Sequence, residues 1–192
     1  DLIILEEIAF LKRKVPENGI SHKKMKEFLA RALYIEMLGK DASFAFIRMV
    51  ELCASSSISA KRMGYLTCSI CLPPTHEFRF MLVNQIQRDM QSANQLEICA
   101  ALHACCKIVT LDMIPAILNL VVKLLEHEQE LVRKRSVCVL HRFWQMDREC
   151  LRDHMHKVKM ALCDPNPSVM AATVAFLDEL VHDDPGAYKD LV

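Results

Sequence analysis

The chain has 192 residues, of which 52% are hydrophobic, and its 24 Lys and Arg residues balance its 24 Asp and Glu residues. This composition supplies enough apolar side chains for a continuous core and excludes an intrinsically disordered chain. The zero net charge predicts no overall attraction to nucleic acid or to an anionic membrane, so any such binding must be local. Every apolar stretch is shorter than the roughly 18 residues that a membrane span requires.

Helices separated by short turns are expected throughout the chain. Only 4 Gly and 7 Pro residues interrupt it, and β-branched residues rarely alternate with polar ones, so strands joined by hairpins are disfavoured. The expected helices are, in chain order, 2–14, 21–38, one that begins at Asp41 or Ser43 and includes Val50, 58–72, 77–90, 95–109, 113–126, 129–146, 150–162 and 168–182. Residues 189–192 resemble the beginning of a further element.

Turn and capping residues mark several of these boundaries. Ser21 can cap the second helix, and Gly39 can adopt the left-handed conformation that closes it. The two prolines at 73–74 stop a strongly apolar helix, because proline lacks an amide donor and restricts the residue before it. Residues 164–167 have the sequence Asp-Pro-Asn-Pro, a turn typical of helical repeats, and Ser168 is expected to open the next helix.

A similar apolar segment recurs at nearly constant spacing. Its copies begin at Lys61, Glu97, Val132 and Val169, which are 36, 35 and 37 residues apart. Such periods are typical of helical solenoids. A helix, a turn and a second helix cannot bury their own apolar faces and must stack on neighbouring pairs. The sequence therefore predicts an all-α fold, an α-solenoid of stacked antiparallel helix pairs, with residues 1–192 forming a single segment.

Motifs for catalysis are missing from the sequence. It contains no Gly-rich phosphate loop, no nucleophile elbow and no zinc-protease helix motif. We therefore expect a protein that is not an enzyme, has no catalytic residues and holds no cofactor or metal.

The positions of the cysteines and histidines in the sequence indicate core packing or surface exposure, not metal binding. Nine cysteines, an odd number, suggest reduced thiols in a cytosolic protein, with Cys99, Cys138 and Cys163 at expected core positions. The pair at 68 and 71 has CxxC spacing but lies within a predicted helix without a second pair, so core packing is preferred to metal binding. His154 and His156 point in different directions on a helix and are expected at the surface.

Two basic clusters open predicted helices. Lys23, Lys24 and Lys26 fall in a first turn, where free amides and the helix dipole favour anions, so a phosphoinositide head group is a candidate ligand. The alternative is a solvated helix start, and Glu27 weakens the positive charge. The second cluster, residues 133–135, is expected to solubilise a turn between repeats.

Eight segments spread over nearly the whole chain form a recognisable pattern. They are KKMKEFLARALYIEMLGKDASFAFI, KRMGYL, FMLVNQIQRDM, EICAALHA, MIPAILNLV, VRKRSVCVLHRF, ALCDPNPSVMAA and AYKDLV. Together they resemble the N-terminal trunk of the large adaptins. The segments MLGKDASF, MIPA, ALCD followed by VMAA, and YKDL are most similar to the epsilon type, which belongs to the fourth heterotetrameric adaptor complex.

This resemblance implies an α-solenoid of the HEAT or armadillo kind, of which the chain is the N-terminal part of a longer trunk. It implies three partner chains, namely a sigma-type small subunit, a beta-type large subunit and a mu-type medium subunit. Recruitment by an Arf-family GTPase and by membrane lipid, peripheral location on the cytoplasmic side of the trans-Golgi network, and selection of transmembrane cargo for intracellular transport are further expectations from the family.

The family's lipid-binding residues carry over only in part. In alpha adaptin a lysine-rich helix start binds phosphoinositide, and the matching positions here are Met25, Lys26 and Glu27. Only Lys26 therefore carries over directly, with Lys23 and Lys24 as neighbours that can compensate.

Two other classes of function remain open from the sequence. The first is another soluble helical-repeat scaffold, such as a transport-receptor-like peptide binder, which would use a ladder of Asn and Trp residues. The single tryptophan, Trp144, argues against that ladder. The second is an enzyme whose site is built from Cys and His side chains.

Overall fold

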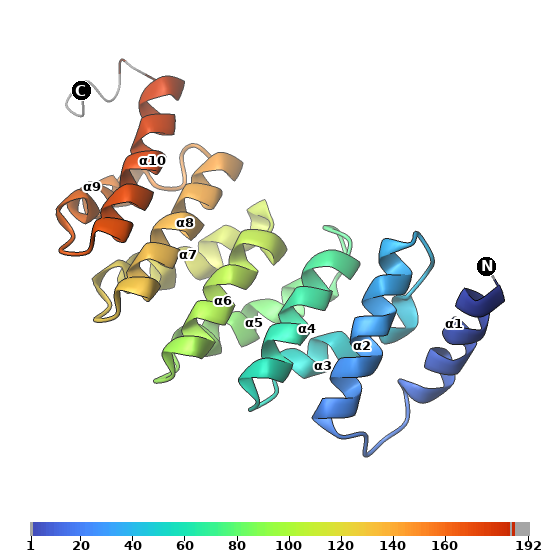
Figure 1. The fold of residues 1–192 in the computed structure, drawn as a ribbon. Helices are drawn as coiled ribbons and strands as arrows, with labels where there is room; N and C mark the ends of the chain where they lie inside the picture. Colours follow the sequence, from blue (N-terminus) through green and yellow to red (C-terminus); the bar gives the residue numbers. More distant parts are fainter. Residues whose placement is uncertain (1, 185, 187–192) are drawn as a thin grey trace. The chain divides into compact units, whose positions relative to one another are not determined.

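The structure is a computed structural model that describes residues 2–184 and 186. All regular elements within this described part are helical, and the chain divides into two compact units at residues 89 and 90 (Figure 1). The first unit contains α1 (Leu2–Lys14), α2 (His22–Met37), α3 (Phe46–Cys53), α4 (Ile58–Cys71) and α5 (Phe78–Met90). The second unit contains α6 (Gln95–Ile108), α7 (Ile114–Lys123), α8 (Glu130–Met146), α9 (Met155–Met160) and α10 (Pro167–Asp183). The element expected at 189–192 lies outside the described residues.

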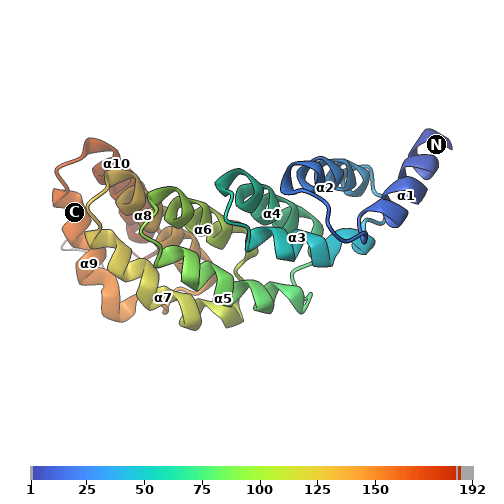
Figure 2. The ribbon, with the colours of Figure 1, turned by 90° about the horizontal axis from the view of Figure 1, so that it is seen from below.

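The predicted repeat is confirmed as a repeat of helix pairs. The four similar segments lie in α4, α6, α8 and α10, which are the same member of each successive pair. In the first unit α2 and α4 form one layer and α3 and α5 the other (Figure 2). In the second unit α6, α8 and α10 form one layer, with α7 and α9 behind them.

Local capping explains most helix ends. The Ser21 side chain accepts a hydrogen bond from the Lys24 backbone amide at 3.3 Å, as predicted for the cap of α2. Gly39 has φ of 75°, the left-handed conformation expected after α2. Helix α10 begins at Pro167, one residue before the expected Ser168, because the Asn166 side chain accepts from the Ser168 amide at 2.9 Å and caps the helix.

The ninth helix is shorter than predicted. Instead of one helix over 150–162, six residues of α-helix lie between two 3₁₀ turns, Arg152–His154 and Ala161–Cys163. The Asp147 carboxylate accepts from the Glu149 amide at 3.0 Å, and the His154 amide donates to the Leu151 carbonyl at 2.8 Å. These local bonds favour turns over a continuous helix in this polar stretch.

Close packing of α3 on α4 defines the core of the first unit. Gly64 of α4 lies against α3 so closely that an added Cβ would be 2.6 Å from the Cys53 backbone nitrogen. Beside it the Cys53 and Cys68 sulfurs are 3.8 Å apart, and both thiols are buried. Only glycine therefore permits this approach of the two helices.

A buried ion pair links α4 to α5. The Lys61 ammonium nitrogen lies 2.5 Å from an Asp89 carboxylate oxygen, and both side chains are about 5% exposed or less. The Tyr65 hydroxyl donates to the second Asp89 oxygen at 2.6 Å, and the Gln85 amide donates to the first at 2.8 Å. Because the carboxylate is satisfied on both oxygens, the cost of burying these charges is offset by hydrogen bonds.

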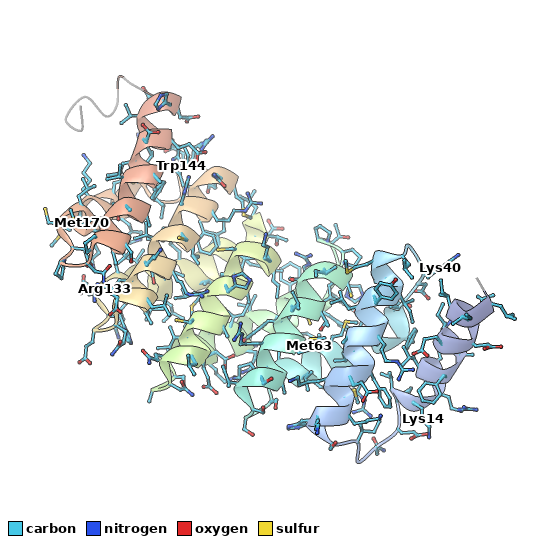
Figure 3. The ribbon with its side chains drawn as sticks, in the orientation of Figure 1. Lys14, Lys40, Met63, Arg133, Trp144 and Met170 are labelled. Atoms are coloured by element: carbon cyan, nitrogen blue, oxygen red, sulfur yellow. The ribbon has the colours of Figure 1, made fainter. Side chains whose placement is uncertain are left out.

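Helix α8 is the centre of the second unit and packs against α6, α7 and α10. Figure 3 shows Arg133 at its beginning and Trp144 near its end. The Arg133 guanidinium donates to both Asp164 carboxylate oxygens, at 2.6 and 2.9 Å. It also donates to the backbone carbonyls of His127 and Glu128, each at 2.9 Å. One side chain thus joins the turn before α8 to the turn before α10.

The expectation for the cysteines is correct for Cys99 but wrong for Cys138 and Cys163. Cys99 is buried, whereas the other two are exposed. Cys138 lies on the side of α8 that faces away from the core, in line with the exposed residues Leu131 and Arg142. Cys163 falls in a 3₁₀ turn, where the helical period on which the prediction rests no longer holds.

The close approach at Gly64 can be tested by substitution. Gly64→Ala should lower the free energy of unfolding by about 1–3 kcal/mol, because the clash involves backbone atoms and outweighs the better helix propensity of alanine. Urea unfolding followed by circular dichroism measures this difference. Ala30→Ser, which also adds one heavy atom but at an exposed position of α2, is the control, and equal stabilities of the two variants would contradict the packing argument.

The Arg133–Asp164 pair predicts a pH-dependent contribution to stability. The hydrogen bonds from Arg133, joined by one from the Asn166 backbone amide, hold the pKa of the Asp164 carboxyl below its ordinary value. A carboxylate with a depressed folded pKa stabilises the fold above its unfolded pKa of about 3.9 and loses this effect as the pH falls toward the folded value. Asp164→Asn should therefore cost about 2 kcal/mol at neutral pH.

The difference between Asp164→Asn and the unsubstituted protein should shrink steadily below about pH 4. Urea unfolding at several pH values between 7 and 3 measures it. Asp153→Asn, at an exposed position in the 3₁₀ turn before α9, should show no such pH-dependent cost. A constant difference for Asp164→Asn down to pH 3 would argue against the ion pair as its source.

Candidate interaction surfaces

The three lysines predicted to hold a phosphoinositide lie at the start of α2, but the structure gives each a different environment. The Lys24 ammonium lies 3.1 Å from the Glu27 carboxylate and 5.3 Å from the centre of the Phe28 ring. The Lys26 ammonium donates to the Ser59 hydroxyl at the start of α4. Lys23 is exposed.

These contacts decide what the cluster can offer to an anion. Lys24 is partly neutralised by Glu27, and Lys26 is directed toward α4, so Lys23 is the cation most accessible to a phosphate. The first turn of α2 adds little, because the Ser21 side chain already accepts from the Lys24 amide. A phosphate that binds here would meet one free lysine and two whose interactions must first rearrange.

An apolar groove between α1 and α2 was not predicted from the sequence. It has a volume of about 420 Å³ and is lined mainly by Ile3, Ile4, Ala30, Tyr34, Ile35 and Leu38, with the ion pair of Arg31 and Glu7 at its edge. Ile3 is 81% exposed and Tyr34 is 62% exposed. Large apolar side chains gathered at this level of exposure mark interaction surfaces more often than free surface. The sequence does carry a signal for this groove. Residues 2–5 are all apolar, which is more than one buried face of a short amphipathic helix requires.

The second basic cluster differs from its prediction. Arg133 does not solubilise a turn; it is half-buried and bound to Asp164. Arg135, two residues later, faces α6 and acts electrostatically on the Cys99 thiol. Residues 133–135 therefore do not act as one group, because successive residues of a helix point to different sides.

The cysteines and histidines considered as candidate site residues lie in the core or near the surface. Cys68 and Cys71 are buried core residues, as predicted, and burial raises the pKa of the Cys71 thiol to about 12. His154 is half-buried and His156 is exposed, which agrees with the predicted surface positions.

Within the described residues, Cys, His, Asp and Glu side chains form no group of three that could hold a metal ion. In the same part of the chain no helix has the length and apolar character needed to cross a bilayer.

Comparison with known proteins decides the family. The profile of the adaptin N-terminal region matches residues 2–192. The chain belongs to the adaptin family. This confirms the resemblance inferred from the eight sequence segments.

Among curated adaptins, this chain is similar to epsilon subunits of AP-4 complexes. It is 42% identical over 192 residues to the AP-4 complex subunit epsilon of Arabidopsis thaliana, an alignment that covers 100% of this chain and 20% of that protein. It is 43% identical over 180 residues to the Dictyostelium discoideum subunit, covering 92% of this chain and 17% of the relative. The human AP-4 complex subunit epsilon-1 is 37% identical over 190 residues, covering 98% and 17%. The chain thus spans about a fifth of the length of these relatives.

Solved structures support the fold. A homology model of the full-length AP-3 complex in an intermediate open conformation has a TM-score of 0.78 at 22% identity, covering 89% of this chain and 30% of that chain. A designed armadillo repeat protein has a TM-score of 0.60 at 17% identity, covering 88% and 79%. The predicted all-α, armadillo-like solenoid of stacked helix pairs is confirmed.

Proposed function

We propose that this adaptin segment is part of the large subunit of a heterotetrameric vesicle adaptor and acts as a scaffold that makes and breaks no bonds. The observation that carries the proposal is the family match over residues 2–192, together with 37–43% identity to epsilon subunits of AP-4 complexes. A stack of helix pairs suits this role, because its stability is distributed along the chain and leaves its surfaces free for partners. In this proposal residues 1–192 form one solenoid segment of a longer trunk.

The proposed partners are a sigma-type small subunit, a beta-type large subunit and a mu-type medium subunit. The apolar groove between α1 and α2 supports docking of another chain on the first unit, and we assign it to the sigma-type subunit. Its exposed apolar side chains, Ile3, Tyr34 and Leu38, would lose their contact with water in such a complex, which favours association.

The proposed site of action is the cytoplasmic face of the trans-Golgi network, where an Arf-family GTPase and membrane lipid would recruit the complex to select transmembrane cargo. Lys23, Lys24 and Lys26 are the proposed contact with a phosphoinositide. The proposal gives Lys23 the leading role, because Glu27 and Ser59 already engage the other two ammonium groups.

The adaptor proposal predicts which chains accompany the protein. Affinity purification of the full-length protein from its own cells should recover beta-type, mu-type and sigma-type chains. Tyr34→Asp should reduce the recovered sigma-type chain several-fold, because it places a charge in the apolar groove. Ile47→Asp alters an apolar side chain of α3 that is 60% exposed and serves as the control. Recovery of the full-length protein without any of these chains would reject the adaptor function.

The lipid proposal predicts an uneven contribution of the three lysines. Replacement of all three by Glu should weaken binding to liposomes that contain phosphoinositide, and Lys23→Glu alone should account for most of the loss. Glu27→Gln should strengthen binding, because it releases Lys24. Co-sedimentation with such liposomes measures all three effects, with Lys40→Glu, just beyond the opposite end of α2, as the control. Unchanged binding of the triple variant would remove this site but not the adaptor function.

A further inference from the structure

A second basic surface lies in the second unit, between α6 and α8, and is separate from the lysines of α2. Arg135 and Arg142 stand on the same side of α8, because seven residues correspond to almost two turns, and the exposed Cys138 lies between them. On α6, the Cys106 thiol lies within electrostatic reach of both arginines and of Lys107. Burial raises the pKa of the Cys106 thiol to about 11, while the charges of Lys107, Arg142 and Arg135 act in the opposite direction, so the three cations lie around this neutral thiol.

The two arginines of this surface differ from the arginines used elsewhere to hold the fold together. Arg31 binds Glu7, and Arg133 binds Asp164 and two carbonyls. Within the described residues neither Arg135 nor Arg142 has an ion pair, and Arg142 has one hydrogen bond, of 3.4 Å, to the Gln145 amide oxygen. The Arg135 Nε atom is buried and has no hydrogen-bond partner in the described part of the chain. A buried donor of this kind costs stability unless an acceptor binds to it.

We propose that this surface binds an acidic segment of a partner protein, with carboxylates on Arg135 and Arg142. The guanidinium group presents paired donors that match a carboxylate. The two arginines are about 10 Å apart along the α8 axis. In a polyproline II segment, residues three apart lie on the same side at a spacing of about 9 Å. A segment with an acidic residue at every third position therefore matches the two cations.

A peptide fits this surface better than a bilayer does. Arg135 is half-buried, and its Nε donor is buried. A flat lipid surface meets side chains that protrude, whereas the carboxylate of a flexible peptide can approach a side chain that does not. The exposed Cys138 thiol between the two arginines adds an uncharged contact for the peptide backbone.

Fluorescence anisotropy of a labelled (Glu-Ser-Pro)₄ peptide with the full-length protein tests the proposal. The peptide should bind, the matched (Gln-Ser-Pro)₄ peptide should not, and binding should weaken with added salt. The double variant Arg135→Gln, Arg142→Gln should weaken binding about tenfold or more, because two charge-assisted contacts are lost. The control is Lys123→Gln with Arg152→Gln, which removes the same charge from exposed positions of the second unit.

Three results would overturn the proposal. The first is that the acidic peptide does not bind, and the second is that the control variant loses as much binding as the arginine variant. The third is that the arginine substitutions leave peptide binding unchanged but abolish binding to phosphatidylserine vesicles. The last result would assign the surface to a membrane. Thermal unfolding verifies that the double variant is folded. If it is not, Arg135→Lys with Arg142→Lys keeps the charges, removes the paired donors, and should still weaken binding several-fold.

Discussion

A single helix pair in this structure cannot cover its own apolar faces, so its helices must pack against neighbouring ones. Helix α8 shows its effect, because it is covered on three sides by α6, α7 and α10. Val132, Val137 and Phe143 are fully buried in those contacts. The exposed Cys138 and Arg142 mark the side of α8 that remains open, and the half-buried Arg135 stands at its border.

Buried polar groups act within this constraint as connections between successive elements. The Lys61–Asp89 pair joins α4 to α5, and the Arg133–Asp164 pair joins the turns that precede α8 and α10. Each carboxylate accepts more than one hydrogen bond, so neither is left unsatisfied in the core. Apolar packing alone permits neighbouring helices to slide, whereas a paired charge has one favourable position, and this fixes the register of each pair.

The fold could be predicted from the sequence because its signals are local or periodic. Ser21 and Gly39 mark the ends of α2 through backbone rules that need no tertiary contact. The spacing of the repeats identified the matching helices. Cys138 was misplaced because its neighbours in the sequence are apolar, and only the packing of α8 between other helices shows which side stays open.

The candidate lipid site could be predicted only as a list of residues, because its chemistry depends on contacts over long sequence distances. Lys26 meets Ser59, 33 residues away, and Lys61 is buried because of a partner 28 residues away. Neither contact leaves a mark in the local pattern. The balance of 24 basic and 24 acidic residues likewise conceals how the charges are used. Arg133 holds two turns together because Asp164 is within its reach, whereas Arg142, which has no ion pair within the described residues, keeps its charge exposed.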